Sequence, residues 1–196
     1  MKSLEQTLKK LNTPEKIQNF LNLLPFNFEK KGETCMSPKK VLETKTAHCF
    51  EGALLAAAAL EAHGHKPLLL DLKASSKDDD HVVALFKIKG KWGAISKTNH
   101  AVLRYREPVY ATVRELAMSY FHEYFLPDGT KTLKSFSKPF DLSKTKIDWK
   151  TSDNDLFVLT RKLDKSPHMQ IVPRGLKLRK ADSIEIRAGE YVEYKP

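Results

Sequence analysis

Two cysteines, Cys35 and Cys49, are the only ones in this chain of 196 residues. The chain has no apolar run approaching the ~20 residues that a membrane span needs. Its first 24 residues alternate charged and apolar positions and contain no apolar stretch of the kind found in signal peptides. We therefore expect a cytoplasmic protein that makes no use of a membrane and keeps both thiols reduced.

Metal-binding motifs are also missing. The sequence contains neither CxxC nor HExxH, and residues 78–80 are three consecutive aspartates, whereas the acids of a calcium loop alternate with other residues. We expect these aspartates to form a solvated loop, and we expect no metal and no cofactor.

The net charge of +10 raises the question of nucleic acid as a partner. Lysines are spread along the whole chain, often beside acids, and no nucleic-acid-binding signature is present. A solvated basic surface is the favoured interpretation, and nucleic-acid binding through that surface is kept as a weaker alternative.

The pattern of apolar residues predicts an α+β fold. Helices are expected over 13–24, from 37 to 42, from 46 to 64 and over 109–125, and strands over 67–72, 81–88 and 91–96. The second and third strands are joined by the tight turn Lys89-Gly90 and should form a hairpin. After a polar tract at 128–146, strand-like segments follow at 156–160, 184–188 and 191–194. We expect a core domain over 1–126 and a β-rich extension over 127–196 packed on it.

The segment from Ala53 to Ala62 is apolar nearly all round, which is typical of a helix buried on most sides. With Thr46 as its N-cap, Cys49 would occupy the third helical position. Unpaired backbone N–H groups and the helix dipole favour an anion there, so they favour a thiolate. His48 would face elsewhere and lie on the surface, while Glu51 would cap the first turn or line a pocket.

A thiolate nucleophile needs a proton acceptor, and His81 can supply one if its strand packs beside this helix. The chain then offers a cysteine on a central helix, a histidine at the edge of a hairpin, and a polar residue after Trp92 on the next strand.

The segments HCFEGALLAAAALEAHG, DDDHVVALF and GKWGAISKTN carry this order, and together they resemble the transglutaminase-like superfamily of papain-type thiol enzymes, including its bacterial cysteine-protease branch. The resemblance covers residues 40–100, about a third of the chain. It implies a papain/transglutaminase-like core in which a central buried helix packs on a small antiparallel sheet. It also implies Cys49 as the nucleophile and His81 as the general base.

The third catalytic position departs from the family pattern, because Ser96 stands where the family has a carboxylate or an amide. We expect Ser96 to support His81 by its position, with Asn99 as a substitute. The backbone N–H of Cys49 would form part of an oxyanion hole, and Asn27 is a weak candidate for the second donor.

Two functions follow from this reasoning. The first is a cysteine-dependent hydrolase, peptidase or acyltransferase that acts on a peptide or protein amide through an acyl-enzyme. The second is a binding protein of the same fold that has lost turnover, and Ser96 is the feature that favours it.

Overall fold

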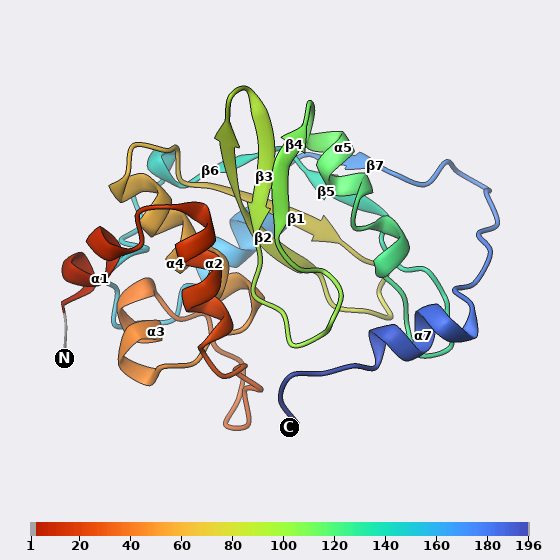
Figure 1. Ribbon diagram of the computed structural model, residues 1–196, viewed down its shortest axis with the longest axis horizontal. Helices are drawn as coiled ribbons and strands as arrows, with labels where there is room; N and C mark the ends of the chain where they lie inside the picture. The colour runs from red at the N-terminus through yellow and green to blue at the C-terminus, as the bar shows by residue number, and fades with distance from the viewer. Residues whose placement is uncertain (1–2, 196) are drawn as a thin grey trace.

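The computed structural model describes residues 3–195 and shows a sheet covered by helices (Figure 1). Every strand pair in this sheet is antiparallel, and the strand order is β4-β3-β2-β1-β5-β7, with β6 also pairing with β1. The predicted α+β class is confirmed. The strands are β1 Leu68–Lys73, β2 His81–Ile88, β3 Lys91–Ile95, β4 Arg106–Tyr110, β5 Ser135–Ser137, β6 Phe140–Asp141 and β7 His168–Gln170.

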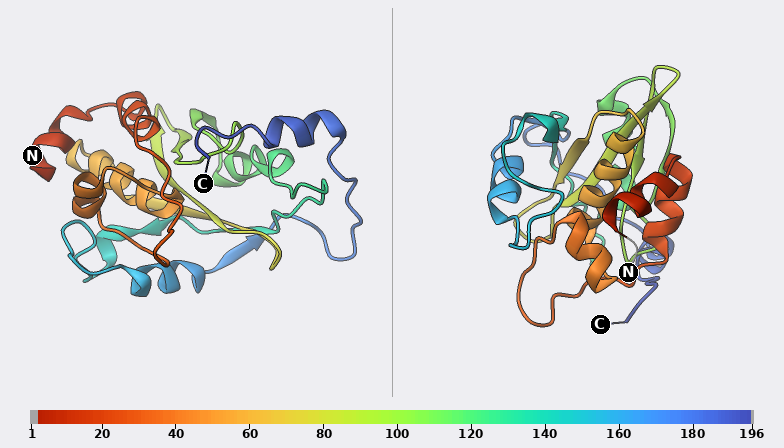
Figure 2. Two further views of the ribbon diagram at one scale, coloured as in Figure 1. Left: turned by 90° about the horizontal axis from the view of Figure 1, so that it is seen from below. Right: turned by 90° about the vertical axis from the view of Figure 1, so that its left-hand side faces the viewer.

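The helices lie on both sides of the sheet (Figure 2). None of them, within residues 3–195, combines the length and the apolar character that crossing a bilayer requires. Their bounds are α1 Leu4–Lys10, α2 Pro14–Asn22, α3 Pro38–Thr44, α4 Cys49–Ala62, α5 Val113–Met118, α6 Phe157–Asp164 and α7 Ser183–Gly189, with 3-10 turns η1 Phe121–Glu123 and η2 Leu142–Lys144.

Helix α4 is the centre of the larger core, as its apolar surface predicts. It packs on β2 and β1 on one side and on α1, α2 and α3 on the others. Leu54, Leu55 and Leu60 each expose at most 1% of their surface. Burial of each such side chain contributes about 1.5–3 kcal/mol to the stability of the fold. Because the remaining side chains of α4 are mostly alanines, the sheet can approach the helix closely. The first residue of α4 is therefore held rigidly.

The hairpin of β2 and β3 places the next two candidate residues. Lys89 and Gly90 turn the chain with positive φ angles of 48° and 78°, and the register runs from Ile88 opposite Lys91 to Ala84 opposite Ile95. His81 begins β2 and Ser96 directly follows β3, so both lie at the same end of the hairpin as the first turn of α4.

Gly52 explains how closely the end of β3 approaches α4. A Cβ atom at position 52 would lie 2.5 Å from the Cβ of Lys97, which is too close for two carbons. Glycine weakens a helix interior by about 1 kcal/mol relative to alanine. At position 52 the absence of a side chain is what permits the contact between the helix and residue 97.

Four predicted elements are wrong. Residues 109–125 do not form one helix, because the chain first completes β4 against β3 and then begins α5 at the new N-cap Thr112. Residues 156–160 belong largely to α6, which buries Leu159 and Leu163 on one face, and residues 184–188 lie in α7, where Asp182 and Glu185 form a capping box. Residues 191–194 form only an isolated bridge between Val192 and His100.

Strands β5 and β6 instead arise within the polar tract at 128–146. β5 and β6 both pair with β1, and β7 pairs with β5, so three short strands of residues 127–196 extend the same sheet that carries β2 and β3. The extension is not β-rich as predicted, because α6 and α7 contain more of its residues than these strands. Serines 135 and 137 are buried there, and the Ser137 hydroxyl accepts a hydrogen bond from the backbone N–H of Asp71 at 2.9 Å. β5 is only three residues long and buries Phe136 between these two serines, so it is too short to show an apolar pattern that would reveal a strand.

Candidate active site

The first turn of α4 begins later than predicted. His48 and not Thr46 is the N-cap, so Cys49 is the first helical residue and not the third. The Thr46 hydroxyl instead donates to the carbonyl of Pro25 at 3.0 Å. As the first residue of the helix, Cys49 has a backbone N–H with no acceptor inside the helix, so the favourable position for an anion is retained.

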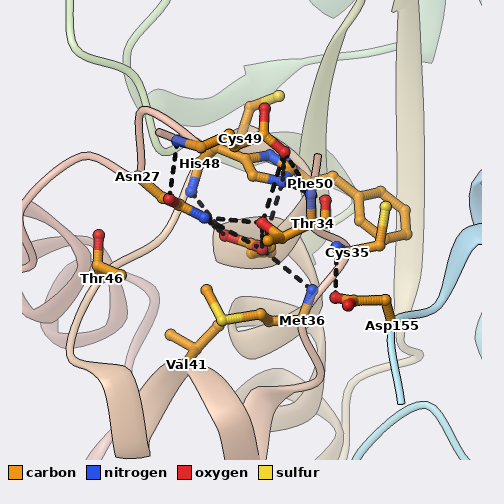
Figure 3. A network of polar contacts seen from close by, with 12 residues as sticks. Asn27, Thr34, Cys35, Met36, Val41, Thr46, His48, Cys49, Phe50 and Asp155 are labelled. Atoms are coloured by element: carbon orange, nitrogen blue, oxygen red, sulfur yellow. Dashed lines mark hydrogen bonds and ion pairs between the residues drawn. The ribbon is translucent and has the colours of Figure 1, made fainter. Parts of the chain in front are cut away.

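His48 is not a surface residue, contrary to expectation. Its side chain is 14% exposed, and its Nε2 lies 3.0 Å from the carbonyl oxygen of Thr34 (Figure 3). Its Nδ1 accepts a hydrogen bond from the backbone N–H of Phe50 at 3.3 Å, which caps the helix. The histidine is enclosed because the chain segment 34–36 passes over it, and that contact is invisible in the local sequence.

Glu51 is the buried centre of a network that ties this segment to α4. Its carboxylate is fully buried and accepts hydrogen bonds from four residues, and the Nε2 of His48 lies 3.4 Å from its Oε1. A buried carboxylate is tolerated only when its lone pairs are satisfied and its charge is compensated. The donors are the side chains of Asn27 and Thr34 and the backbone N–H groups of Met36 and His48.

This network also decides the role of Asn27. Its side-chain amide donates to the Thr34 hydroxyl at 2.8 Å and to the Glu51 carboxylate at 3.1 Å. Both contacts use the hydrogens that an oxyanion hole would need, so the geometry does not support Asn27 as the second oxyanion donor.

His81 and Ser96 meet as the sequence predicts. Both are buried, and the Nε2 of His81 lies 2.8 Å from the Ser96 hydroxyl oxygen. The same hydroxyl donates to the carbonyl oxygen of Leu103 at 2.6 Å. A hydroxyl has one hydrogen and a carbonyl can only accept, so Ser96 must accept from His81. The neutral imidazole therefore carries its hydrogen on Nε2, which leaves Nδ1 unprotonated.

The backbone of Ser96 is fixed by the side chain of Gln18 on α2. Gln18 accepts from the Ser96 N–H at 2.9 Å and donates to the Ser96 carbonyl at 2.7 Å. This pair of hydrogen bonds holds Ser96, which orients His81, although Gln18 is far from Ser96 in sequence.

The electrostatics favour a thiolate at Cys49. Burial opposes the charged form, but hydrogen bonds with His48 and His81 outweigh it and lower the pKa of Cys49 to about 5. Cys35 shows the contrast, because burial without such partners raises its pKa to about 12.

The pKa of His48 responds in the opposite sense. Burial lowers it, yet the Cys49 thiolate, Glu51 and the Thr34 carbonyl together raise it to about 9. The protonated His48 ring has a hydrogen on Nδ1 and cannot accept the hydrogen bond from the Phe50 N–H. The helix-capping hydrogen bond therefore forms only with the neutral ring, and the ion pair with Cys49 forms only with the charged ring. We favour the charged ring beside a thiolate, because the carboxylates of Glu51 and Glu29 lie 3.4 and 3.8 Å from Nε2.

A cavity of about 510 Å³ opens onto Cys49 and His81. The loop before β2 forms one wall, and residues of α7 form another. Asn99 also lines this cavity, but its side chain accepts from the Tyr194 N–H at 2.8 Å and donates to the Tyr194 carbonyl at 2.9 Å. The structure thus brings Cys49, His81 and Ser96 together, and it uses Asn99 to hold the C-terminal segment.

One group of carboxylates, which shares Asp80 with the wall of the cavity, has the spacing of metal ligands. Oxygen atoms of Asp71, Asp80 and Asp164 lie within 4.8 Å of one another. The ammonium group of Lys73 forms ion pairs with both Asp80 and Asp164, and His168 lies 3.0 Å from Asp71. Lys73 therefore already compensates charge on Asp80 and Asp164, and Asp71 has His168 as a hydrogen-bond partner.

Comparison with known proteins adds no assignment, because no protein-family model and no curated protein matches the chain.

Proposed function

We propose that this protein is a thiol enzyme that attacks an amide or peptide-like carbonyl through Cys49. The observation that carries the proposal is the juxtaposition of a half-buried Cys49, whose thiolate is stabilised by hydrogen bonds, with His81, whose free Nδ1 follows from the Ser96 contact. The resemblance to transglutaminase-like enzymes is in line with this proposal. A cytoplasmic location, also proposed, would keep the thiol reduced.

In the first half of the reaction, the Cys49 thiolate adds to the carbonyl carbon and the carbonyl oxygen becomes an oxyanion. The free backbone N–H of Cys49 at the start of α4 is the donor available to that oxygen. The tetrahedral intermediate collapses, the carbon–nitrogen bond breaks, and the leaving amine takes a proton from the His81 imidazolium. An acyl-thioester remains on Cys49.

In the second half, water or another nucleophile gives a proton to Nδ1 of His81 and attacks the thioester. Collapse releases the acyl product and restores the thiolate and the imidazolium. Hydrolysis and transfer differ only in which nucleophile enters the cavity.

Ser96 would perform one of the two functions of the carboxylate in a catalytic triad. It fixes the tautomer and the orientation of His81, but it brings no negative charge to support the imidazolium. We assign the missing support of the ion pair to His48, whose charge is compensated by the buried Glu51.

The test is the alkylation of Cys49 by iodoacetamide as a function of pH, read by mass spectrometry with Cys35 as the internal control. Alkylation that persists at pH values well below ~8.5, which is the pKa of an ordinary thiol, and that weakens in His81→Ala supports the enzyme. A Cys49 that reacts only as an ordinary thiol contradicts it.

The second candidate is a binding protein of the same architecture, and the uncharged Ser96 is the observation that favours it. Incubation with an array of acyl probes separates the two functions. Covalent labelling that requires Cys49 supports the enzyme, whereas reversible binding unchanged in Cys49→Ser supports the binding protein.

A further inference from the structure

The cavity around Cys49 has a charge opposite to that of the whole protein. The chain carries a net charge of +10, yet the cavity is lined by six acidic residues, one lysine and no arginine. The acidic residues are Glu29, Asp78, Asp79, Asp80, Glu123 and Glu190.

The lysine of the cavity is already committed. Lys97 is buried, its ammonium group donates to the carbonyl oxygen of Leu24, and it lies 5.6 Å from the centre of the Tyr194 ring. The charge of a protonated His48 is compensated by the buried Glu51 carboxylate, and in the proposed mechanism the thiolate balances the imidazolium of His81. None of these cations is left to neutralise the acidic side chains of the wall.

Four of the six acids have partners inside the protein. The carboxylate of Asp80 pairs with Lys73, and that of Glu123 pairs with Arg106. Asp78 accepts from the Thr132 hydroxyl and Glu29 from the backbone N–H of Thr34. These carboxylates stabilise the walls of the cavity.

Asp79 and Glu190 are different, because within residues 3–195 neither carboxylate has an ion-pair or hydrogen-bond partner. They stand on separate walls, one in the loop before β2 and one at the end of α7. Asp79 is held close to the thiol, since its carbonyl accepts from the Tyr124 hydroxyl and the carbonyl of the next residue, Asp80, lies 4.0 Å from the Cys49 Sγ.

We propose that this cavity selects a substrate with a positive charge beside the carbonyl that Cys49 attacks, such as a peptide with a lysine or arginine side chain next to the attacked amide. This inference rests on the proposed function. Asp79 and Glu190 are the residues that determine the preference.

The physical basis is the focusing of a negative potential in a partly enclosed cavity. Unpaired carboxylates on two walls attract a cationic group and repel an anionic one, and low-dielectric walls screen these forces less than bulk water does. The basic remainder of the surface does not offer the same environment, because its positive charge is spread over the whole chain.

The experiment compares two reagents of similar size that form a disulfide with a thiolate and release methanesulfinate. One is 2-aminoethyl methanethiosulfonate, a cation, and the other is 2-sulfonatoethyl methanethiosulfonate, an anion. The ratio of their rate constants at Cys49 is divided by the same ratio for a small free thiol. We expect a normalised ratio of about 10 or more at low salt, falling toward 1 in 1 M salt.

The variants Asp79→Asn and Glu190→Gln should each lower the normalised ratio several-fold, and together they should bring it near 1. Glu107→Gln is the matched control, because it removes the same charge from an exposed position on β4 outside the cavity. The control should keep the wild-type ratio.

The outcomes separate this inference from the proposed function. A reactive Cys49 without a preference for the cation, or a preference unchanged in the double variant, overturns the inference and leaves the thiol enzyme standing. A Cys49 that reacts with neither reagent at pH 6 removes the proposed function, and the substrate preference falls with it.

Discussion

The Ser96 hydroxyl lies 2.8 Å from the Nε2 of His81 and gives its only hydrogen to the carbonyl of Leu103. An uncharged side chain thereby holds the imidazole in one tautomer, which in the usual thiol triad is the task of a carboxylate or an amide.

The first prediction concerns this tautomer. Ser96→Ala removes the acceptor from Nε2, so the neutral His81 ring should populate both tautomers and lose orientation. We expect turnover of any substrate that is found to fall by about 10²-fold or more, since removal of a tautomer-fixing partner can cost up to about 10⁴. The nitrogen chemical shifts of His81 measure the tautomer of the neutral ring, so the spectra are recorded in a Cys49→Ser background, which has no thiolate to pair with the imidazolium. Ser96→Thr keeps the hydroxyl and should retain the Nε2–H form, and a wild-type spectrum in Ser96→Ala would refute the assignment.

The second prediction separates two roles of His48. Asparagine is a good N-cap, so His48→Asn should preserve the start of α4 while it removes the imidazole beside the thiol. The pKa of Cys49 should then rise from about 5 toward the value of an ordinary thiol, because one of its two stabilising hydrogen bonds is lost. The pH profile of alkylation measures this change. If His48 acts only as a helix cap, the profile of His48→Asn will match the wild type.

The third prediction concerns stability. Glu51→Gln removes the charge of a buried carboxylate that accepts hydrogen bonds from four residues. It also removes the nearer of the two carboxylates beside His48. Breaking one partner out of a buried pair costs about 3–5 kcal/mol, and we expect a loss of that order in the free energy of unfolding by denaturant. Glu43→Gln on the exposed side of α3 is the matched control and should change it by less than about 0.5 kcal/mol. Equal effects in the two variants would show that the network does not stabilise the fold.

The fourth prediction is a pH dependence of stability. The folded state lowers the pKa of Cys49 from 9.0 to about 5, so the contribution of the thiolate to stability is complete above pH 9 and is lost progressively as the pH falls to 5. His48 has its pKa raised from 6.5 to about 9, so its contribution is complete below 6.5 and is lost as the pH rises through 9. Between pH 6.5 and 9 the two changes oppose each other, so the net contribution of the pair to stability is nearly constant there and decreases as the pH falls from 6.5 to 5.

Unfolding of Cys49→Ser at several pH values tests this dependence. The difference in unfolding free energy from the wild type should be small below pH 5 and larger at pH 7. Cys35→Ser is the control, because burial raises the pKa of that thiol to about 12 and it stays neutral over this range. A difference for Cys49→Ser that does not vary between pH 4 and 7 would count against the thiolate.

Local patterns predicted the elements that carry the thiol and the imidazole. The apolar surface of α4 predicts its burial, and the turn at Lys89-Gly90 predicts the hairpin of β2 and β3. The same local patterns gave the wrong elements for 156–160 and 184–188, because such short segments with apolar residues are compatible with a strand or a helix. The surrounding contacts, with Leu159 and Leu163 buried on one face of α6, decide between them.

By itself, the sequence determined a buried helix with Cys49 in its first turn and a hairpin with His81 and Ser96 at one end. Both features follow from apolar periodicity and turn chemistry within a few residues. Only the tertiary structure decided that His48 is enclosed, that Glu51 is buried among donors from 27–36, and that Asn99 holds the C-terminal segment. These facts depend on which distant segments satisfy each polar group, and a buried polar group takes its partners from whatever the fold brings within hydrogen-bond reach.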